Sequence, residues 1–398
     1  MNAVIQQKSA IPHKMNDGLG ITHTHLNCEK RVSAPVVECD ITPQTLIEHG
    51  PPCTSGRAIV FADSEVWQRL EPWLGGAFNA AYADVQVVRL PGGEACKSLD
   101  SLHHVLAQMA AMQIVRRGDA LFALGGGSVL DVVGFAASIF RRGVRLTKIP
   151  TSLLAQVDAA ISLKNAINLG KGKNLVGSFA PPHSVLVDFR FLDTLALRHR
   201  SNGMAEIIKL GLMVDAPLIN ALAIASKRPM ESPSTMYTIF RQAITGMACQ
   251  LNRDPYEQLL QRAVDFGHWL SPQLEMADNT LLHGEAVAID MAISLTVSLH
   301  RGHMSPKAWT FALGLLSSWN LPLSHDALDS ALVKDSLKRT LQHRGGVQNI
   351  PMCMGIGSHE FFDDLHSDEV LQAHTRLVNN PPTIAGPMSV GMTPVATR

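Results

Sequence analysis

In the first half of the chain, short apolar runs alternate with longer stretches in which apolar residues recur every three or four positions. The short runs predict strands and the longer stretches predict helices, because the two structures repeat their side-chain directions at different intervals. Strand–helix alternation is typical of a parallel sheet covered by helices on both faces. The predicted strands are Ala58–Ala62, Val85–Leu90, Asp119–Leu124 and Val144–Ile149, and the clearest helices are Ser98–Met112 and Val129–Ile139.

From about Leu192 onward, the strand pattern gives way to long stretches with helical periodicity. Such stretches bury one face against neighbouring helices. The sequence therefore predicts that the second half is all-helical and that the two halves join near Asp188–Arg200. The stretches with this pattern are Gly203–Met213, Ser234–Leu251, Pro255–Trp269, Glu285–His300 and Pro306–Trp319.

The chain has 398 residues, which is long enough for two domains with separate cores. We predict an α/β domain over residues 33–190 and a helical domain over residues 191–376. Residues 1–32 have no clear period, and residues 377–398 contain Asn-Pro-Pro, Gly-Pro and Thr-Pro sequences. We expect both terminal segments to be disordered or loosely packed.

Charge and composition narrow the function classes. The chain has 34 basic and 34 acidic residues, whereas proteins that bind nucleic acids or membrane surfaces normally carry a basic excess, so we expect neither partner. No apolar run is long enough to span a bilayer, and residues 1–24 lack the apolar region of a signal peptide. The six cysteines form no CxxC pair, which favours free thiols in a reducing cytoplasm.

The Gly125-Gly126-Gly127 turn is a candidate ligand site, because it follows a predicted strand and opens a predicted helix. Glycines let the backbone approach a pyrophosphate, and the helix N-terminus supplies free N–H groups and a favourable dipole. The spacing is not GxGxxG, so a tight turn without a ligand is an equal alternative. Glu94 and Lys97 follow another strand, where a carboxylate would accept hydrogen bonds from ribose. Taken alone, however, this motif favours an exposed ion pair.

A second candidate segment follows the predicted strand end at Ile149–Ser152 and contains Asp158, Lys164, Lys173 and Asn174. Ligands bind outside the carboxyl ends of strands in open sheets, and lysine binds phosphate as a point charge. A solvated loop is the alternative, but apolar residues alternate with the lysines, which favours a packed segment. The glycine turn and this segment together predict two neighbouring anions, a dinucleotide and a phosphorylated substrate.

Metal-ligand residue types occur in the helical half. Glu206 and Lys209 are three residues apart on one predicted helix face, and His268 and His283 follow later in the chain. One carboxylate and two imidazoles with an open coordination position make a catalytic zinc set. No local spacing rule connects them, however, so each histidine by itself is more often a hydrogen-bonded core or surface residue.

Taken together, these segments resemble the sugar phosphate cyclase superfamily, whose members share a dehydroquinate synthase-like fold. The resemblance runs from about Ala58 to Asp364 and rests on motifs that occur in the family's order. The motifs are Gly-Glu-x-x-Lys, Gly-Gly-Gly-x-x-x-Asp, Arg-Gly-Val, Pro-Thr-Ser-Leu-Leu-Ala-x-Val-Asp, Lys-Asn-x-x-Gly-x-Phe, Phe-Leu-x-Thr-Leu, Gly-Met-Ala-Glu-x-x-Lys, Gly-His and Leu-His-Gly-Glu-Ala-Val-Ala.

The resemblance implies an α/β NAD-binding N-terminal domain and an all-helical C-terminal metal-binding domain, with the active site between them. It implies that a divalent metal, usually zinc with cobalt as an alternative, is bound by Glu206, His268 and His283. The residues that match NAD-contacting positions are Asp63, Glu94, Lys97, Gly126, Gly127, Asp131, Thr151, Ser152, Asp158, Lys173 and Thr194. Those that match substrate and phosphate positions are Lys164, Asn174, Lys209 and Arg142. In the family, the counterpart of Arg142 comes from the other subunit, so the resemblance implies a homodimer.

Departures from the dehydroquinate synthase pattern indicate which sugar phosphate is bound. Where that enzyme typically has an arginine, an asparagine and a second histidine, this chain has Gln261, Asp265 and Pro272. A family lysine that helps to hold the substrate carboxylate is Met247 here. The loss of cationic groups suits a substrate without a carboxylate, and Asp265 is expected to repel one. These features, with the His343–Gly346 segment, resemble cyclases that act on sedoheptulose 7-phosphate.

The reaction implied by the resemblance is redox-neutral overall. Bound NAD+ would oxidise a ring hydroxyl transiently, phosphate would leave by elimination, NADH would return the hydride, and an aldol step would close a C7 cyclitol. Lys164 and Lys209 would balance the developing charge. The stereochemistry of the product stays open, because Ala159–Leu163 differs from the glycine-containing run usual in those cyclases.

Three other functions stay open at this point. The first is 3-dehydroquinate synthase, and the second is a metal-dependent polyol dehydrogenase, which typically has a lysine where this chain has Gly134. The third is a non-enzymatic binding protein descended from a cyclase. The presence of Glu206, His268 and His283 argues against that third alternative.

Overall fold

The computed structural model describes residues 33–170, 172–226 and 233–379. From Ala34 onward, the described residues belong to one compact unit. The expected loose segment 1–32 and residues 380–398 lie outside the described part of the chain. Residues 377–379 complete a regular helix, so the predicted start of the C-terminal tail is wrong.

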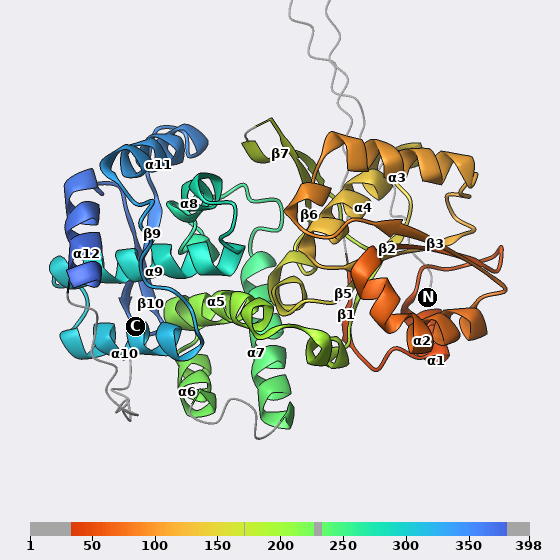
Figure 1. The fold of residues 1–398 in the computed structure, drawn as a ribbon, viewed down its shortest axis with the longest axis horizontal. Coiled ribbons are helices and arrows are strands. Elements are labelled where there is room, and N and C mark those ends of the chain that lie inside the picture. The colour runs from red at the N-terminus through yellow and green to blue at the C-terminus, as the bar shows by residue number, and fades with distance from the viewer. Residues whose placement is uncertain (1–32, 171, 227–232, 380–398) are drawn as a thin grey trace, which may run out of the picture. The chain divides into compact units, whose positions relative to one another are not determined.

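The first half contains a six-stranded sheet in which every neighbouring pair is parallel (Figure 1). Its spatial order is β1-β8-β5-β4-β2-β3. The four predicted strands are confirmed as β2 to β5, while β1 and β8 were not predicted. The strands are β1 (Val36–Glu38), β2 (Arg57–Asp63), β3 (Asp84–Leu90), β4 (Ala120–Gly125), β5 (Leu146–Pro150) and β8 (Ser184–Val187).

Both faces of this sheet are buried, as predicted. Alternate residues of β2 point into different cores: Ile59 and Phe61 belong to one hydrophobic cluster, and Val60 belongs to the other. The first cluster includes the helices α3 (Leu99–Ala111) and α4 (Gly127–Ile139) and continues into the helical half. The second includes α1 (Pro43–His49) and α2 (Ser64–Ala81). One core therefore joins the sheet to the helices that follow.

A separate antiparallel hairpin connects the sheet to the helical half. It consists of β6 (Lys164–Leu169) and β7 (Gly172–Phe179), with Lys164 paired opposite Phe179 at its base. The hairpin packs on α4 so closely that a Cβ at Gly134 would lie 1.9 Å from Asn165 Oδ1. The segment that carries the predicted phosphate-binding lysines is therefore packed, as expected, rather than a solvated loop.

The second half is built mainly from helices (Figure 1). Almost every residue of its central helix is buried, which explains why that helix is apolar on all sides. The helices are α5 (Leu197–Val214), α6 (Ala216–Ala225), α7 (Pro233–Leu251), α8 (Ser271–Ala277), the central α9 (His283–His300), α10 (Pro306–Ser318), α11 (Ser330–His343) and α12 (Ser367–Asn379).

Two predictions for the second half are wrong. It is not all-helical, because β9 (Ile350–Gly355) and β10 (Ser358–Phe362) form an antiparallel hairpin around Gly357, whose φ is +80°. The stretch from Pro255 to Trp269 is not a helix, and only Ala263–Asp265 forms a short 3₁₀ turn. Positive φ angles at Glu257 (+54°) and Gly267 (+77°) interrupt any regular helix there.

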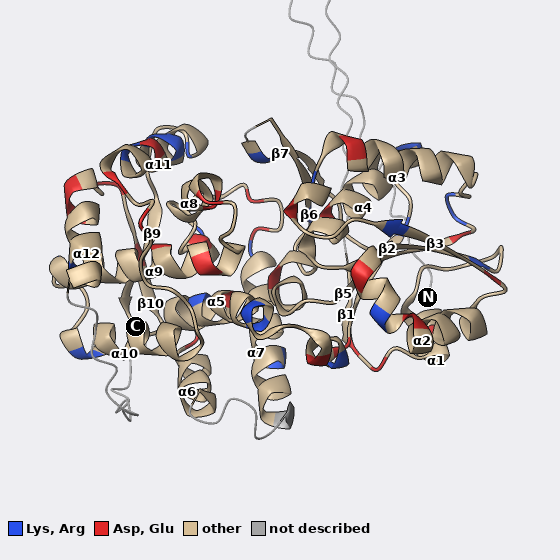
Figure 2. Cartoon of the chain, in the orientation of Figure 1, with Lys and Arg blue, Asp and Glu red and all other residues tan. Residues whose placement is uncertain are grey.

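Acidic and basic positions are interspersed over both halves of the chain (Figure 2), in keeping with the net charge of zero. Among the described residues, no helix is both long and apolar enough to cross a membrane.

Candidate active site

The carboxyl ends of the central strands form one side of the site. Strand β2 pairs with β3 on one side and β4 on the other, so the strand order reverses between β2 and β4, where open α/β sheets bind ligands. Asp63 ends β2, and its Oδ1 accepts hydrogen bonds from the N–H groups of Glu65 (3.0 Å) and Val66 (3.2 Å). This cap leaves Asp63 Oδ2 facing Gly92, where a Cβ would lie only 2.3 Å away.

The glycine turn occupies the adjacent strand end. Gly126 is the N-cap of α4 and Gly127 its first residue, and no side chain caps the helix. The first N–H groups of α4 are thus available to an anion. The turn is held by a hydrogen bond from the Thr151 N–H to the Gly125 carbonyl (3.0 Å), and a Cβ at Gly127 would lie 3.3 Å from Ala159 Cβ.

The predicted nucleotide-contacting charges form two ion pairs. Lys97 is buried, and its Nζ lies 2.6 Å from Asp131 Oδ2 on α4. Glu94 is half-exposed and accepts a hydrogen bond from Asn168 Nδ2 (2.8 Å), while Lys173 Nζ lies 3.8 Å from Glu94 Oε1. The alternative of a plain exposed ion pair fails for Lys97, because Lys97 is buried and its partner Asp131 is only 16% exposed.

The remaining predicted nucleotide residues make mostly local contacts. Ser152 Oγ accepts a hydrogen bond from the Ala155 N–H (3.3 Å), and Thr194 Oγ1 donates one to the Phe191 carbonyl (2.8 Å). Asp158 lies in a π-helical turn, Ala155–Ala159. Burial and the negative charge of Glu206 raise the pKa of Asp158, which places this carboxyl electrostatically close to the metal candidates.

Glu206, His268 and His283 come together in the helical half. Glu206 lies on α5, His268 precedes α8, and His283 opens α9. Glu206 Oε1 lies 3.7 Å from His268 Nε2 and 3.4 Å from His283 Nε2, and the three candidate ligand atoms all lie within 4.8 Å of one another. This spacing fits ligands around one ion, because metal–ligand distances near 2 Å bring tetrahedral ligand atoms about 3.3 Å apart.

Hydrogen bonds orient both imidazoles so that their Nε2 atoms lie near Glu206. His268 Nδ1 donates to the Phe266 carbonyl (3.1 Å), and His283 Nδ1 lies 3.0 Å from Glu275 Oε1. Each bond engages Nδ1 and leaves Nε2 as the nitrogen that can bind a cation, as second-shell partners do in zinc sites. Sequence reasoning missed Glu275, because only the packing of α8 against α9 shows that it contacts His283.

The charges around the cluster favour cation binding. Although burial favours the neutral acid, Lys209 and the two imidazoles lower the pKa of Glu206. Burial and Lys209 lower the pKa of His268 to about 4, which keeps it neutral. Burial opposes protonation of His283, but Glu275 and Glu206 raise its pKa to about 10, so a metal would displace that proton.

The cluster passes a simple test of fit for a metal. Both oxygens of Glu206 are fully buried, and in the described part of the chain neither accepts a hydrogen bond of regular geometry. Lys209, which is 2% exposed, contacts Glu206 Oε2 and is its close charge partner. A buried carboxylate with two directed imidazoles and incomplete hydrogen bonding suits a divalent cation.

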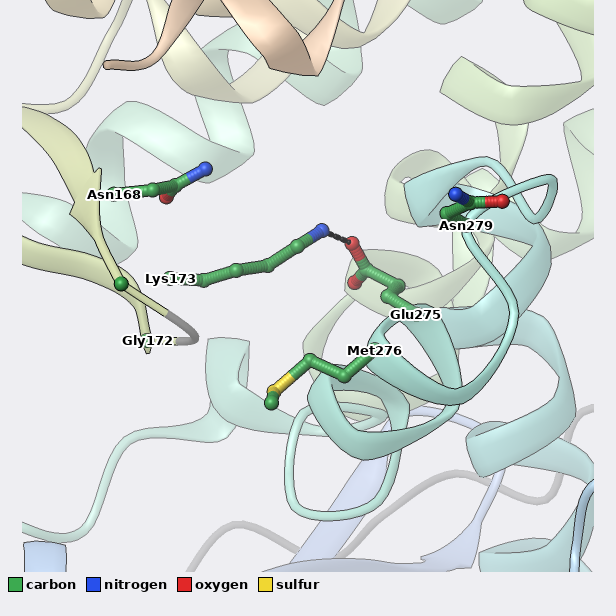
Figure 3. Close-up of a pocket in the computed structure, with 7 residues that line it drawn as sticks. Asn168, Gly172, Lys173, Glu275, Met276 and Asn279 are labelled. Carbon is green, nitrogen blue, oxygen red and sulfur yellow. Dashed lines mark hydrogen bonds and ion pairs between the residues drawn. The ribbon is translucent and has the colours of Figure 1, made fainter.

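A pocket of about 410 Å³ lies between the hairpin tip and α8 (Figure 3). Lys173 reaches into it from the hairpin and pairs with Glu275 from α8. The pocket is lined by Asn168, Gly170, Gly172, Lys173, Glu275, Met276 and Asn279. The predicted nucleotide lysine is therefore connected to a ligand-supporting residue of the metal cluster.

The predicted substrate residues are paired with other protein groups. Lys164 Nζ lies 2.8 Å from Glu257 Oε1, a partner that sequence reasoning missed. Asn174 has a left-handed backbone (φ +55°), and its N–H donates to Asn168 Oδ1 at 2.9 Å. This backbone bond fixes the turn of the hairpin.

Asp265, which is expected to repel a substrate carboxylate, is not an isolated charge. Its carboxylate is held by two guanidinium groups: Arg262 bonds both oxygens, and Arg344 Nη2 donates to Oδ2 at 3.1 Å. Burial opposes ionisation, but these arginines lower the pKa of Asp265. Asp265 is thus an anion whose charge is offset by two arginines, one of which, Arg262, is also paired with Glu257.

Arg142 does not reach the site within one chain. The glycine turn and Thr151 lie at the carboxyl ends of strands, whereas Arg142 precedes β5 and therefore lies toward the amino ends of the strands. Its side chain is exposed, and its carbonyl accepts a hydrogen bond from Arg116 Nη2 (3.3 Å).

The fold and site define a class. A parallel sheet with an uncapped glycine turn at its switch point, together with a buried carboxylate and two partly buried imidazoles in the helical half, is the arrangement of a nucleotide- and metal-dependent enzyme. Family models described as 3-dehydroquinate synthase N-terminal and C-terminal match residues 87–202 and 203–343, more than half of the chain. The chain belongs to the 3-dehydroquinate synthase family.

Individual relatives sharpen this assignment. The chain is 37% identical to a 2-epi-5-epi-valiolone synthase from Actinomyces sp, over 71% of this chain and 77% of that protein. Its structure is similar to that of the 2-epi-5-epi-valiolone synthase ValA from Streptomyces hygroscopicus subsp. jinggangensis 5008 with NAD+ and Zn2+ bound, with a TM-score of 0.84, 33% identity and coverage of 89% and 99% of the two chains. A 2-deoxy-scyllo-inosose synthase complexed with carbaglucose-6-phosphate, NAD+ and Co2+ gives a TM-score of 0.70 at 25% identity, covering 82% and 91%.

Proposed function

We propose that the protein is a sugar phosphate cyclase that converts sedoheptulose 7-phosphate into a C7 cyclitol, 2-epi-5-epi-valiolone or an epimer, and releases phosphate. The observation that carries the proposal is the Glu206–His268–His283 cluster, which lies in the same compact unit as the nucleotide-type turn. The similarity to 2-epi-5-epi-valiolone synthases over most of the chain supports the substrate class.

We infer that Glu206, His268 and His283 hold a divalent metal, with zinc or cobalt as the candidates. NAD+ would lie across the carboxyl ends of β2 and β4, with its pyrophosphate at the N-terminus of α4. When bound, NAD+ supplies a hydride acceptor and the metal supplies positive charge that stabilises alkoxide and enolate character. The donor set and the buried, incompletely bonded Glu206 support this assignment.

The protein's own residues would orient the substrate and balance its charge. Lys209, buried beside Glu206, provides a fixed positive charge at the reacting end. Lys164 provides a second charge that a phosphate group would share with Glu257. The carbon–oxygen lyase activity and the release of phosphate follow from the proposed substrate, whose leaving group is its phosphate ester.

Two positions argue against the alternative functions. A polyol dehydrogenase typically has a lysine at the place of Gly134, yet a Cβ there would lie 1.9 Å from Asn165 Oδ1, so the packing of α4 on β6 excludes any side chain. For 3-dehydroquinate synthase, the position of the carboxylate-holding lysine is Met247, which is 2% exposed and part of the core. Gln261, at the position where that enzyme typically has an arginine, donates a hydrogen bond to Asn349 Oδ1 (3.2 Å) within the protein.

The direct test is a parallel assay of two substrates with the purified full-length protein. We expect phosphate release from sedoheptulose 7-phosphate, a cyclitol identified by NMR, and no net absorbance from NADH, because the hydride returns within each cycle. The seven-carbon phosphorylated keto acid should turn over with a far lower kcat/KM. Stoichiometric NADH would identify a dehydrogenase, and equal efficiency on both substrates would favour 3-dehydroquinate synthase.

We also propose a homodimer in which Arg142 acts in the partner's site. Its exposure at the amino-end side of the strands, away from its own site, supports this arrangement, as does the exposed Ile139 (45% exposed) three residues before it in the chain. Mixing an Arg142→Ala variant with a His283→Ala variant should restore part of the activity, because one mixed site is intact. If activity does not recover in mixtures that are shown to exchange subunits, the proposed role of Arg142 in the partner's site is contradicted.

A cytoplasmic location remains a prediction. It is supported by the five cysteines in the described ranges, which are all free, as expected in a reducing compartment.

A further inference from the structure

The β6–β7 hairpin touches the helical half at two places. At its base, Lys164 pairs with Glu257 (2.8 Å) and the ring of Phe179 lies 6.0 Å from that of Tyr256. At its tip, Lys173 pairs with Glu275 on α8. The hairpin therefore links the two sides of the site through side chains from both ends.

Glu275 differs from an ordinary surface carboxylate. Its side chain is only 9% exposed, and its two oxygens contact different halves of the site. Oε1 is 3.0 Å from His283 Nδ1, whereas Oε2 is bonded by Lys173 Nζ. Figure 3 shows Lys173 crossing from the hairpin to meet this carboxylate at the pocket. An ion pair on the surface would contribute little to stability. A largely buried carboxylate that bridges two groups instead fixes the positions of both, here His283 and Lys173.

The contacts continue on both sides of this bridge. His283 leads to Glu206 through its Nε2, 3.4 Å from Oε1. Lys173 leads to Glu94, 3.8 Å away, and Glu94 accepts a hydrogen bond from Asn168 on the hairpin. An uninterrupted series of charged contacts thus runs from the metal cluster to the predicted nucleotide-binding residues.

We propose that Glu275 is a positioning residue that couples the metal site to the nucleotide site. One oxygen orients His283, and the other holds the hairpin tip through Lys173. The proposal rests on the proposed function, because it takes a metal at His283 and NAD+ beside the hairpin. A metal on His283 Nε2 fixes the ring and its Nδ1–H bond, so Glu275 stays turned toward Lys173 and the hairpin tip is ordered before the nucleotide arrives.

The ordering of the hairpin tip by the metal has a thermodynamic consequence. Part of the entropy cost of fixing the hairpin is already met in the metal-loaded protein, so NAD+ should bind more tightly to it. Linkage requires that NAD+ strengthen metal binding by the same factor. Couplings of this kind are at least about fivefold in typical proteins, which is within the reach of calorimetry.

The test is calorimetric titration of NAD+ into the full-length protein, once stripped of metal and once saturated with Co2+. We expect the Co2+-loaded wild type to bind NAD+ at least about fivefold more tightly than the stripped protein. Glu275→Gln keeps an acceptor for His283 but loses the pair with Lys173, so the ratio of the two affinities should fall to about one. Lys173→Met should also lower the ratio to about one, and Lys173→Arg should restore it.

Controls separate this role from general damage. Glu71→Gln removes a carboxylate from an exposed pair with Arg89 (3.2 Å) and should leave the ratio at the wild-type value. Glu275→Gln should also weaken Co2+ binding itself by about 10- to 100-fold, as second-shell changes do, so loading is checked by Co2+ absorbance. Circular dichroism and thermal unfolding establish that each variant is folded.

Two outcomes would overturn the coupling. Equal NAD+ affinity of stripped and loaded wild type would show that the sites are independent, with the proposed function intact. A wild-type ratio that persists in both Glu275→Gln and Lys173→Met would show that the coupling runs elsewhere. Absence of NAD+ binding in every state is a different result, because it would overturn the proposed function together with the coupling.

Discussion

The two sides of the site are built by different means. The nucleotide side is made from backbone at strand ends and from the Gly126–Gly127 helix start, which lie close together in the sequence. The metal side is made from charged side chains that balance one another: Glu206 and Lys209, which are buried on α5, and His283, which is partly buried on α9. The nucleotide side should therefore be sensitive to added volume, and the metal side to loss of a charge or a ligand.

The largest expected effect is on the metal side. His283→Ala removes one of three ligands, so we expect Co2+ affinity to fall by more than about 100-fold and turnover to be lost. Metal content measured after dialysis and the rate of phosphate release check this. His104→Ala, an exposed histidine on α3, is the matched control and should change neither value. Full occupancy and a normal rate in His283→Ala would show that this cluster is not the metal site.

A smaller effect is expected on the nucleotide side. Gly127→Val adds volume where a Cβ alone would lie 3.3 Å from Ala159 Cβ, at the first residue of α4. We expect NAD+ affinity to fall about 10-fold or more, since an anion can no longer approach the helix N-terminus closely. Co2+ binding measured without NAD+ should stay close to wild type, because no charge is changed. Gly75→Val on the surface helix α2 serves as control, because its surroundings leave more room for a Cβ, with the nearest atom at 3.6 Å. Loss of Co2+ binding in Gly127→Val with the fold intact would erase the distinction between the two sides.

The smallest expected effect concerns stability and pH. Lys148 on β5 is fully buried, and its Nζ has no hydrogen-bond partner in the described part of the chain, unlike Lys209 and Lys97, which are paired. Burial lowers the pKa of Lys148 from 10.5 to about 8, with Asp131 opposing the shift. Between pH 8 and 10.5, Lys148 is protonated in the unfolded chain but neutral in the folded protein. The free energy of unfolding therefore rises with pH over this range and is lower below pH 8.

Lys148→Met should therefore stabilise the protein at pH 7 by about 1–3 kcal/mol, and this gain should shrink as the pH approaches 10. Denaturant unfolding at several pH values measures both the gain and its decline. Lys97→Met is the matched control with the opposite sign, because it leaves the partly buried Asp131 without its partner at 2.6 Å. If Lys148→Met were less stable than wild type at pH 7, an unseen partner for this amine would be implied.

Local patterns predicted the sheet half well. The strands β2 to β5 and the helices α3 and α4 each have a clear apolar period and lie in unbroken sequence, so chain-local physics was sufficient. The same approach failed at Pro255–Trp269, where apolar spacing suggested a helix but backbone at Glu257 and Gly267 adopts positive φ. It also missed the β9–β10 hairpin. Its two short strands form because they pair with each other, and that pairing is not visible in the sequence of either strand.

The sequence by itself determined the residue types of the site and the positions that matter: the glycine turn, the lysines of the hairpin, and one carboxylate with two histidines. Only the tertiary structure decided which charges meet. It placed Glu275 between His283 and Lys173, paired Lys164 with Glu257, and enclosed Asp265 between two arginines. Coulombic interactions and hydrogen bonds depend on distances of a few ångströms between segments tens of residues apart, and no local periodicity encodes those distances.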